Sequence, residues 1–261
     1  MKTKYVVTEI NLHVSRHISK LGHNIYAFST VPGNEAHQPK LNDEPLSNVH
    51  GTCSKHCEGC AKDGACYAWK AFKFHHNHVV KAWSENTLLL RSGKLFEMLD
   101  YYINNINSNP KKKPVETFRI NTSGEIESVN DLIGWNNLAK KFPSTTFSVY
   151  TKNYEALEEF IKLEGDSADN FVINVSQWNH CADEFLKKYP NKFNVFEYDG
   201  TNRAHHEFSK EDVERLAKLP HCPSVGRDGK SRFNPDGSKI TCDQCKKCYR
   251  KTRSTTAVYS H

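Results

Sequence analysis

Long apolar runs are missing from this chain of 261 residues. None approaches the ~18 residues that a membrane-spanning helix requires. The first residues, Met1 to Val7, also lack the apolar core and the small-residue cleavage site of a signal peptide. We therefore expect a cytoplasmic protein with no membrane partner. Hydrophobic residues make up only 37% of the chain, but the 11% of aromatic residues add bulky core material. This composition predicts a folded protein with a polar surface and long loops.

A strong excess of one charge is also missing. Lys and Arg number 36 against 30 Asp and Glu, which gives a formal charge of +6 and suits an anionic partner only weakly. The basic residues are spread out apart from two clusters: Lys111-Lys112-Lys113, which we interpret as a solvated loop, and Lys246-Lys247 with Arg250-Lys251 and Arg253 near the C-terminus. No helix-turn-helix, aromatic RNA-binding motif or nuclease histidine cluster is visible. Nucleic acid is therefore one candidate partner, and no pattern identifies a substrate or an oligomeric state.

Disulfide bonds are not expected, because thiols are kept reduced in the cytosol. Cysteine is nevertheless abundant, and eight of the nine cysteines fall into two groups. The first group is Cys53, Cys57 and Cys60 in a C-x3-C-x2-C pattern, followed by Cys66. The second is Cys242, Cys245 and Cys248 in a C-x2-C-x2-C pattern, with Cys222 upstream. The ninth, Cys181, we interpret as a buried thiol.

These spacings predict bound metal. Closely spaced thiolates wrap around a compact inorganic core, and C-x2-C-x2-C is the ferredoxin-type spacing for a [4Fe–4S] cluster. Zinc is the alternative metal, but a structural zinc usually takes two C-x2-C pairs from one small module. Here the only such pair outside the tail is Cys57 with Cys60. We expect one or two [4Fe–4S] clusters, with the eight cysteines forming two separate sites or one shared site.

The pattern along the chain predicts an α/β fold. Strands are expected at residues 24–31, 115–120, 145–150, 171–175 and 192–198. Helices are expected at 129–141, 154–163, 182–188 and 210–219, and one or two more between 66 and 106. Such alternation indicates βαβ units and a parallel sheet. We predict a partial (βα) TIM-like barrel over residues 1–219 and a cysteine-rich metal-binding tail over 220–261, without helix or strand.

The first cysteine loop resembles that of the radical S-adenosylmethionine superfamily. There, C-x3-C-x2-C after a first strand binds three irons, and a fourth iron chelates S-adenosylmethionine. Ser123-Gly124-Glu125 follows the strand expected at 115–120 and resembles the Gly-Gly-Glu segment that contacts this cofactor's amino group. The resemblance implies a cofactor site at these three residues. Gly59 and Ser123 depart from the superfamily pattern, and Cys66 adds a potential fourth ligand.

A second resemblance covers most of the chain. Its motifs are residues 21–29, the cysteine loop ending at Cys66-Tyr67-Ala68, residues 118–125, residues 147–152 and the Cys242 to Cys248 tail. Together they resemble the phage gene product 88 family, found on phages and mobile elements. Two hypotheses follow. The first is an iron–sulfur enzyme of the radical S-adenosylmethionine type. The alternative is a non-catalytic, metal-stabilised protein that binds nucleic acid in phage or plasmid replication.

Overall fold

The computed structural model describes residues 10–16, 18–41, 44–57, 66–74, 76–177, 180–199, 209–228 and 230–259. The strands are β1 (Ile25–Ala27), β2 (Lys40–Leu41), β3 (Glu44–Pro45), β4 (Thr117–Arg119), β5 (Thr146–Thr151), β6 (Phe171–Gln177), β7 (Asn194–Asp199) and β8 (Thr255–Tyr259). The α-helices are α2 (Tyr67–Phe74), α3 (His76–Arg91), α4 (Leu95–Asn107), α5 (Val129–Lys141), α6 (Tyr154–Glu164), α7 (His180–Lys188), α8 (Lys210–Lys218) and α9 (Cys242–Cys245). Two 3-10 turns, η1 (Lys55–Cys57) and η2 (Lys247–Tyr249), complete the described elements.

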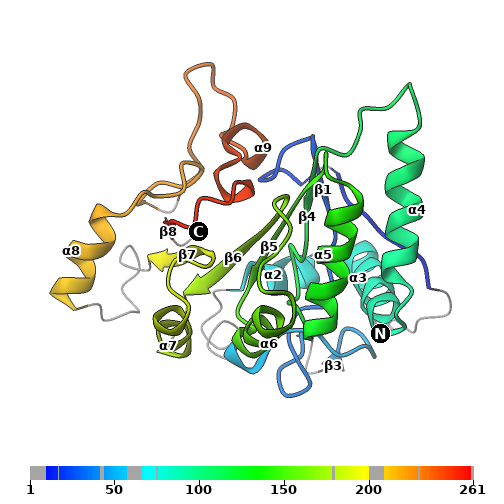
Figure 1. Cartoon of the computed structure of the whole chain (residues 1–261), viewed down its shortest axis with the longest axis horizontal. Helices are drawn as coiled ribbons and strands as arrows, with labels where there is room; N and C mark the ends of the chain where they lie inside the picture. Colours follow the sequence, from blue (N-terminus) through cyan, green and yellow to red (C-terminus); the bar gives the residue numbers. More distant parts are fainter. Residues whose placement is uncertain are drawn as a thin grey trace.

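Six strands form one open sheet in the order β1-β4-β5-β6-β7-β8, and every neighbouring pair is parallel. The strands β2 and β3 form a separate two-stranded sheet, and the other six lie side by side in the order in which they occur along the chain. Right-handed crossovers between strands laid down in chain order place the connecting helices on the same face. Figure 1 shows α5 and α6 in front of the sheet, as this rule requires. The expectation of an α/β fold with a parallel sheet is confirmed.

The main hydrophobic core lies between this helical layer and one face of the sheet. Strand residues alternate between the two faces, so Phe118, Phe147 and Val149 point toward the helices. They pack against apolar side chains of α4 to α7, with Trp135 of α5 near the centre. The expected helical region between residues 66 and 106 contains three helices. Gly93, at φ +75°, ends α3 and separates it from α4.

The opposite face of the sheet carries polar side chains that hold the C-terminal tail, defined here as the residues after 219. Asn174 donates to Ser148 Oγ and to the Cys248 carbonyl, both at 3.1 Å. Asn194 donates to Asn174 Oδ1 at 3.2 Å and to the Arg250 carbonyl at 2.8 Å. A ladder of side chains across three strands thus binds the tail's backbone.

The tail also reaches both edges of the sheet. At one edge β8 pairs with β7. Beside the other edge, the N–H groups of Cys242 and Asp243 donate to the carbonyls of Lys20 and Leu21 at 3.1 and 2.9 Å, just before β1. Figure 1 shows the tail, in orange to red, extending between these two places.

The expectation of a tail without helix or strand is therefore wrong. The short segment Thr255–Tyr259, rich in β-branched and aromatic residues, is stabilised as a strand by pairing with β7. The predicted domain boundary at residue 220 stays a prediction. Strand β8 belongs to the predicted tail, but it is part of the sheet formed by the strands of residues 1–219. In the part of the chain that is described, no helix has the length and apolar character needed to cross a membrane.

Candidate metal centre

A cavity of about 630 Å³ opens on the tail-covered face of the sheet, toward the carboxyl ends of the strands. Carboxyl ends of parallel strands are where α/β proteins usually build their sites. Eight cysteines are described, all with free thiols. Seven of them line this cavity: Cys53, Cys57, Cys66, Cys222, Cys242, Cys245 and Cys248. Cys181 is not among its described lining residues.

The first cysteine group lies in the loop that follows β1. The N–H of Gly33 donates to Cys53 Sγ at 3.2 Å, and η1 brings Cys57 next to Cys53. A hydrogen bond with Cys53 lowers the pKa of Cys57 to about 6, and Lys152 acts in the same direction, against the effect of burial. The same hydrogen bond and burial raise the pKa of Cys53. Cys60 lies outside the described residues.

The predicted Ser123-Gly124-Glu125 turn reaches the same cavity. Gly124 has φ +78°, and a Cβ there would lie 1.8 Å from Thr30 Oγ1, so the turn needs glycine to pack against the β1 loop. Glu125 is buried, and its carboxylate accepts from the backbone N–H groups of Ile126 and Lys152, both at 2.8 Å. Burial raises the pKa of Glu125 to about 7, and neighbouring Cys57 adds to the effect. Ser123 Oγ is buried and makes no hydrogen bond within the described structure.

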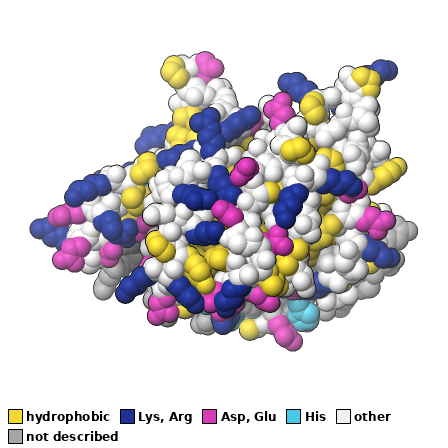
Figure 2. Space-filling model, in the orientation of Figure 1, with side chains coloured by type: hydrophobic (Ala, Val, Ile, Leu, Met, Phe, Trp, Pro, Cys, Tyr) yellow, Lys and Arg dark blue, Asp and Glu magenta, His cyan; other side chains and the backbone are white. Residues whose placement is uncertain are grey.

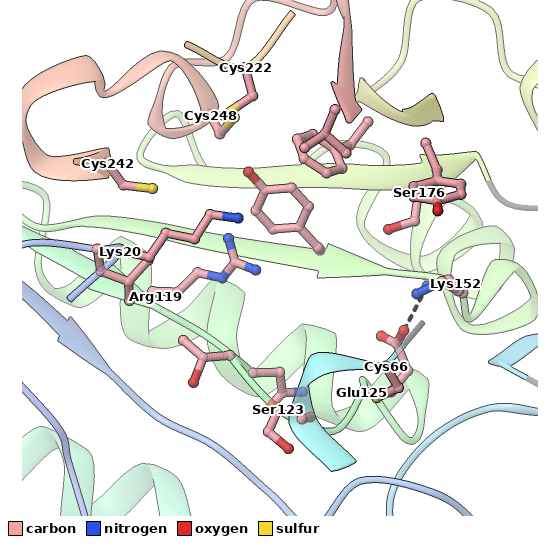
Figure 3. Close-up of a pocket in the computed structure, with 18 of the residues that line it drawn as sticks. Lys20, Cys66, Arg119, Ser123, Glu125, Lys152, Ser176, Cys222, Cys242 and Cys248 are labelled. Carbon is pink, nitrogen blue, oxygen red and sulfur yellow. Dashed lines mark hydrogen bonds between the residues drawn. The ribbon is translucent and has the colours of Figure 1, made fainter. Parts of the chain in front are cut away.

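The second group, Cys222, Cys242, Cys245 and Cys248 (the tail cysteines), lies at the other end of the cavity. Figure 3 shows Cys222, Cys242 and Cys248 apart from Cys66 and Glu125, with Lys20 and Arg119 between the two ends. Burial raises the pKa of Cys242 to about 11, and the positive charges of Arg119 and Lys20 oppose that shift. Burial also raises the pKa of Cys248.

Sequence reasoning missed Lys20 and Arg119. The Arg119 guanidinium lies 3.7 Å from the centre of the Tyr150 ring, and its charge acts on Cys242 and Cys248. Burial lowers the pKa of Lys20, and the tail cysteines oppose this shift. One signal was available for Arg119. It follows Phe118 in a buried strand, so alternation places it on the face opposite the helices.

Ligand spacing bears on which metal this site suits. Thiolates around one zinc ion lie roughly 3.8 Å apart, as tetrahedral Zn–S bonds of about 2.3 Å require. Within the described ranges, no three His, Cys, Asp or Glu side chains gather in this way around one point. The cysteines are instead distributed along the cavity, as two groups. The seven predicted ligands that the structure describes and the Ser-Gly-Glu turn thus share one cavity, while their metal and cofactor remain predictions.

The fold and the cavity define a cysteine-rich α/β protein with two thiol groups on one face of a parallel sheet. The sequence profile of the Gene product 88 family matches residues 18–251, so the chain belongs to this family. This confirms the second resemblance seen in the sequence. The resemblance to radical S-adenosylmethionine proteins has no support from a family match. Comparison with curated proteins and with solved structures gave no significant match.

Proposed function

We propose that this protein is an iron–sulfur enzyme of the radical S-adenosylmethionine type. Cys53, Cys57 and Cys60 would hold one [4Fe–4S] cluster, and the tail cysteines would hold a second. Ser123, Gly124 and Glu125 would bind the cofactor's methionyl end. The single observation that carries the proposal is the convergence of seven cysteines and this turn on one cavity, from segments that lie far apart in the sequence.

The order of the sheet also supports the proposal. A radical S-adenosylmethionine-like partial barrel consists of parallel strands laid down in chain order, with helices outside and the site inside. The sheet here has that order, with helices on one face and the cavity on the other. A partial barrel is therefore our interpretation of this open sheet.

The residues around the thiols suit an anionic metal–thiolate centre. Each group has its own nearby cation: Lys152 acts on Cys57, and Lys20 and Arg119 act on the tail cysteines. A cluster held by three or four thiolates is anionic, and buried anionic charge requires compensation.

Ser123 and Glu125 would have different roles at the site of the first cysteine group. When bound, a [4Fe–4S] cluster with one iron free of protein ligands supplies one-electron chemistry to S-adenosylmethionine. The unpartnered hydroxyl of Ser123 would accept from, or donate to, the cofactor's polar end. Glu125 uses its carboxylate to hold the ends of β4 and β5 together, and in its ionised form it would attract an ammonium group.

The nucleic-acid alternative gains little from the structure. Two basic residues of the tail, Lys251 and Arg253, form ion pairs with Asp166 at 3.4 and 2.9 Å. Figure 2 shows Lys and Arg side chains interspersed with Asp and Glu over the visible face. Nucleic-acid surfaces usually concentrate basic residues without acidic neighbours. We therefore rank this function below the enzyme.

The test is the iron, sulfide and zinc content of the full chain purified without oxygen. Roughly eight irons with matching sulfide would support two clusters, and zinc without sulfide would overturn the proposal. Titration with S-adenosylmethionine, followed by electron paramagnetic resonance, then tests for the open iron. A spectrum that the cofactor leaves unchanged in both the wild type and Cys66→Ala would exclude the radical mechanism while leaving the clusters in place.

A further inference from the structure

The cavity face of β6, β7 and β8 carries a patch of side chains beyond the point where the tail is attached. Asn174 and Asn194 bind the tail's carbonyls. Ser176 and Phe196 lie two residues further along the same strands, so they share this face about 7 Å closer to the carboxyl ends. Both residues line the cavity. The patch therefore begins one row beyond the asparagines.

The register of the sheet makes this patch continuous across three strands. Ser176 pairs with Phe196, Phe196 pairs with Thr256, and Tyr198 pairs with Val258. These five side chains all line the cavity, and we call them the ring platform. Thr256 and Val258 are buried, whereas Phe196 and Tyr198 are only partly buried although they lie inside a strand. The two aromatic rings are therefore accessible from the cavity.

The charged residues of β7 point away from the ring platform. Glu197 and Asp199 alternate with the two aromatic residues, so they lie on the opposite face of the strand. There Glu197 binds Arg215 at 2.6 Å, and Asp199 binds His221 at 2.8 Å. The platform itself consists of two aromatic rings, one valine and two small hydroxyl residues. It therefore offers apolar and aromatic contact area to a ligand.

The ring of Phe196 is held in one orientation by Tyr150. The two ring centres lie 4.7 Å apart with the rings at 90°, which is the edge-to-face arrangement that aromatic pairs favour. A ring that is already fixed loses little conformational freedom when a ligand packs against it. Phe196 is therefore a preformed contact surface.

The ring platform is a separate part of the cavity from the Ser-Gly-Glu turn. That turn follows β4, and β7 lies three places further along the sheet. Three strand spacings of about 4.8 Å correspond to roughly 14 Å. In Figure 3, Ser176 lies on the same side of the view as Lys152, opposite Cys242. A molecule on the platform would thus lie beside a cofactor at the turn.

Resting on the proposed function, we infer that the enzyme's substrate presents an aromatic ring with apolar edges, of the phenyl or phenol type, and that this ring packs on the ring platform. Aromatic rings that pack offset or edge-on against Phe and Tyr gain stability beyond the area that they bury. A nucleobase suits the platform less well, because its polar edges need several hydrogen-bond partners when buried. A cavity of about 630 Å³ lies within the usual range for small-ligand sites.

The experiment compares the binding of two neutral probes to the full chain, purified without oxygen. The probes are N-acetyl-phenylalaninamide and N-acetyl-cyclohexylalaninamide, which differ only in that the ring of the second is saturated. Saturation-transfer NMR gives both affinities, with and without excess S-adenosylmethionine. The phenyl probe should bind about three- to tenfold more tightly, as the gain from aromatic pairing predicts. A site that selects only for apolar area would instead prefer the larger cyclohexyl ring.

Variants assign this preference to the ring platform. Phe196→Leu keeps an apolar side chain but removes the ring, so it should abolish the preference for the phenyl probe. Tyr198→Leu provides a second test on the same strand. Phe233→Leu is the matched control, because Phe233 is exposed and is not among the described lining residues of the cavity, so the preference should stay unchanged. Melting temperatures of the variants separate loss of binding from loss of folding.

Three results would overturn the inference: no binding of the phenyl probe, equal affinity for the two probes, or a preference that persists in Phe196→Leu. Displacement of the phenyl probe by S-adenosylmethionine would also contradict it, because the platform would then hold the cofactor. Iron content measured on the same samples keeps the two proposals distinguishable. A preparation with clusters that shows no preference for the phenyl probe contradicts the substrate inference alone, and one without iron that retains the preference contradicts the metal assignment.

Discussion

The carboxylate of Glu125 accepts a hydrogen bond from the backbone N–H of Lys152 at 2.8 Å, which ties the turn after β4 to the end of β5. The same carboxylate accepts from the N–H of Ile126. Glu125, which the sequence predicts as a cofactor-binding residue, therefore also stabilises the contact between these two segments.

The first prediction concerns pH. Burial raises the pKa of Glu125 to about 7 in the folded protein, whereas an unfolded glutamate titrates near about 4.3. Between these values the folded state retains a proton that the unfolded state has lost. The free energy of unfolding should therefore fall as pH rises from about 5 to 8. In Glu125→Gln this slope should be reduced, as measured by urea denaturation at a series of pH values. An equal slope in both proteins would contradict the prediction.

The second prediction concerns Gly124. Alanine there meets both a positive φ and the side chain of Thr30, so Gly124→Ala should lower the free energy of unfolding by roughly 2–4 kcal/mol. Gly165→Ala is the matched control, because Gly165 has φ +73° but open space around its Cβ position. That variant should lose only about 1–2 kcal/mol. Equal losses would mean that the contact with Thr30 contributes nothing.

The third prediction concerns Asn174, which joins the sheet to the tail. Asn174→Ala removes the hydrogen bonds to Ser148, Val149 and Cys248 and should cost about 2 kcal/mol or more. Hydrogen exchange should speed up in residues 246–254. Asn104→Ala, which removes one hydrogen bond to Asp100 on the exposed side of α4, should change stability by less than about 0.5 kcal/mol. Unchanged exchange in the tail would rule out the ladder as its anchor.

The fourth prediction separates the cysteines by position. Cys248→Ser should remove about half of the iron, because it breaks only the tail site, and Cys57→Ser should remove the other half. Cys181→Ser should leave the iron content unchanged, since Cys181 is not part of the described cavity lining. Loss of all iron in either single variant would instead indicate one shared centre.

The alternating strands and helices between residues 115 and 219 could be predicted from the sequence to within a few residues. Their apolar periodicity is strong, and each element is long enough to show it. β8 could not be predicted, because Thr255–Tyr259 follows a basic run and is stabilised mainly by pairing with β7. The separation of α3 from α4 at Gly93 was also missed, because helical spacing continues on both sides of it.

The residues of the candidate site were also only partly predictable from the sequence. The cysteines could be identified because their spacing is local. Strand alternation could have placed Arg119 on the correct face of the sheet, but the sequence does not show that Lys20 and Arg119 meet the tail cysteines, because this happens only after the chain has folded. A lysine before the first strand has no sequence feature that relates it to a cysteine at position 242.

The contacts of the tail at both edges of the sheet imply an order of assembly. Cys242 binds the backbone of Lys20, and β8 pairs with β7, so the cavity is complete only when the last described strand has been synthesised. Contacts so distant in sequence form late, because closing long loops costs entropy. The first cysteine loop, β4 and β5 leave the ribosome well before the tail. Metal that enters during synthesis would therefore find the first group exposed, and the tail would then close over it.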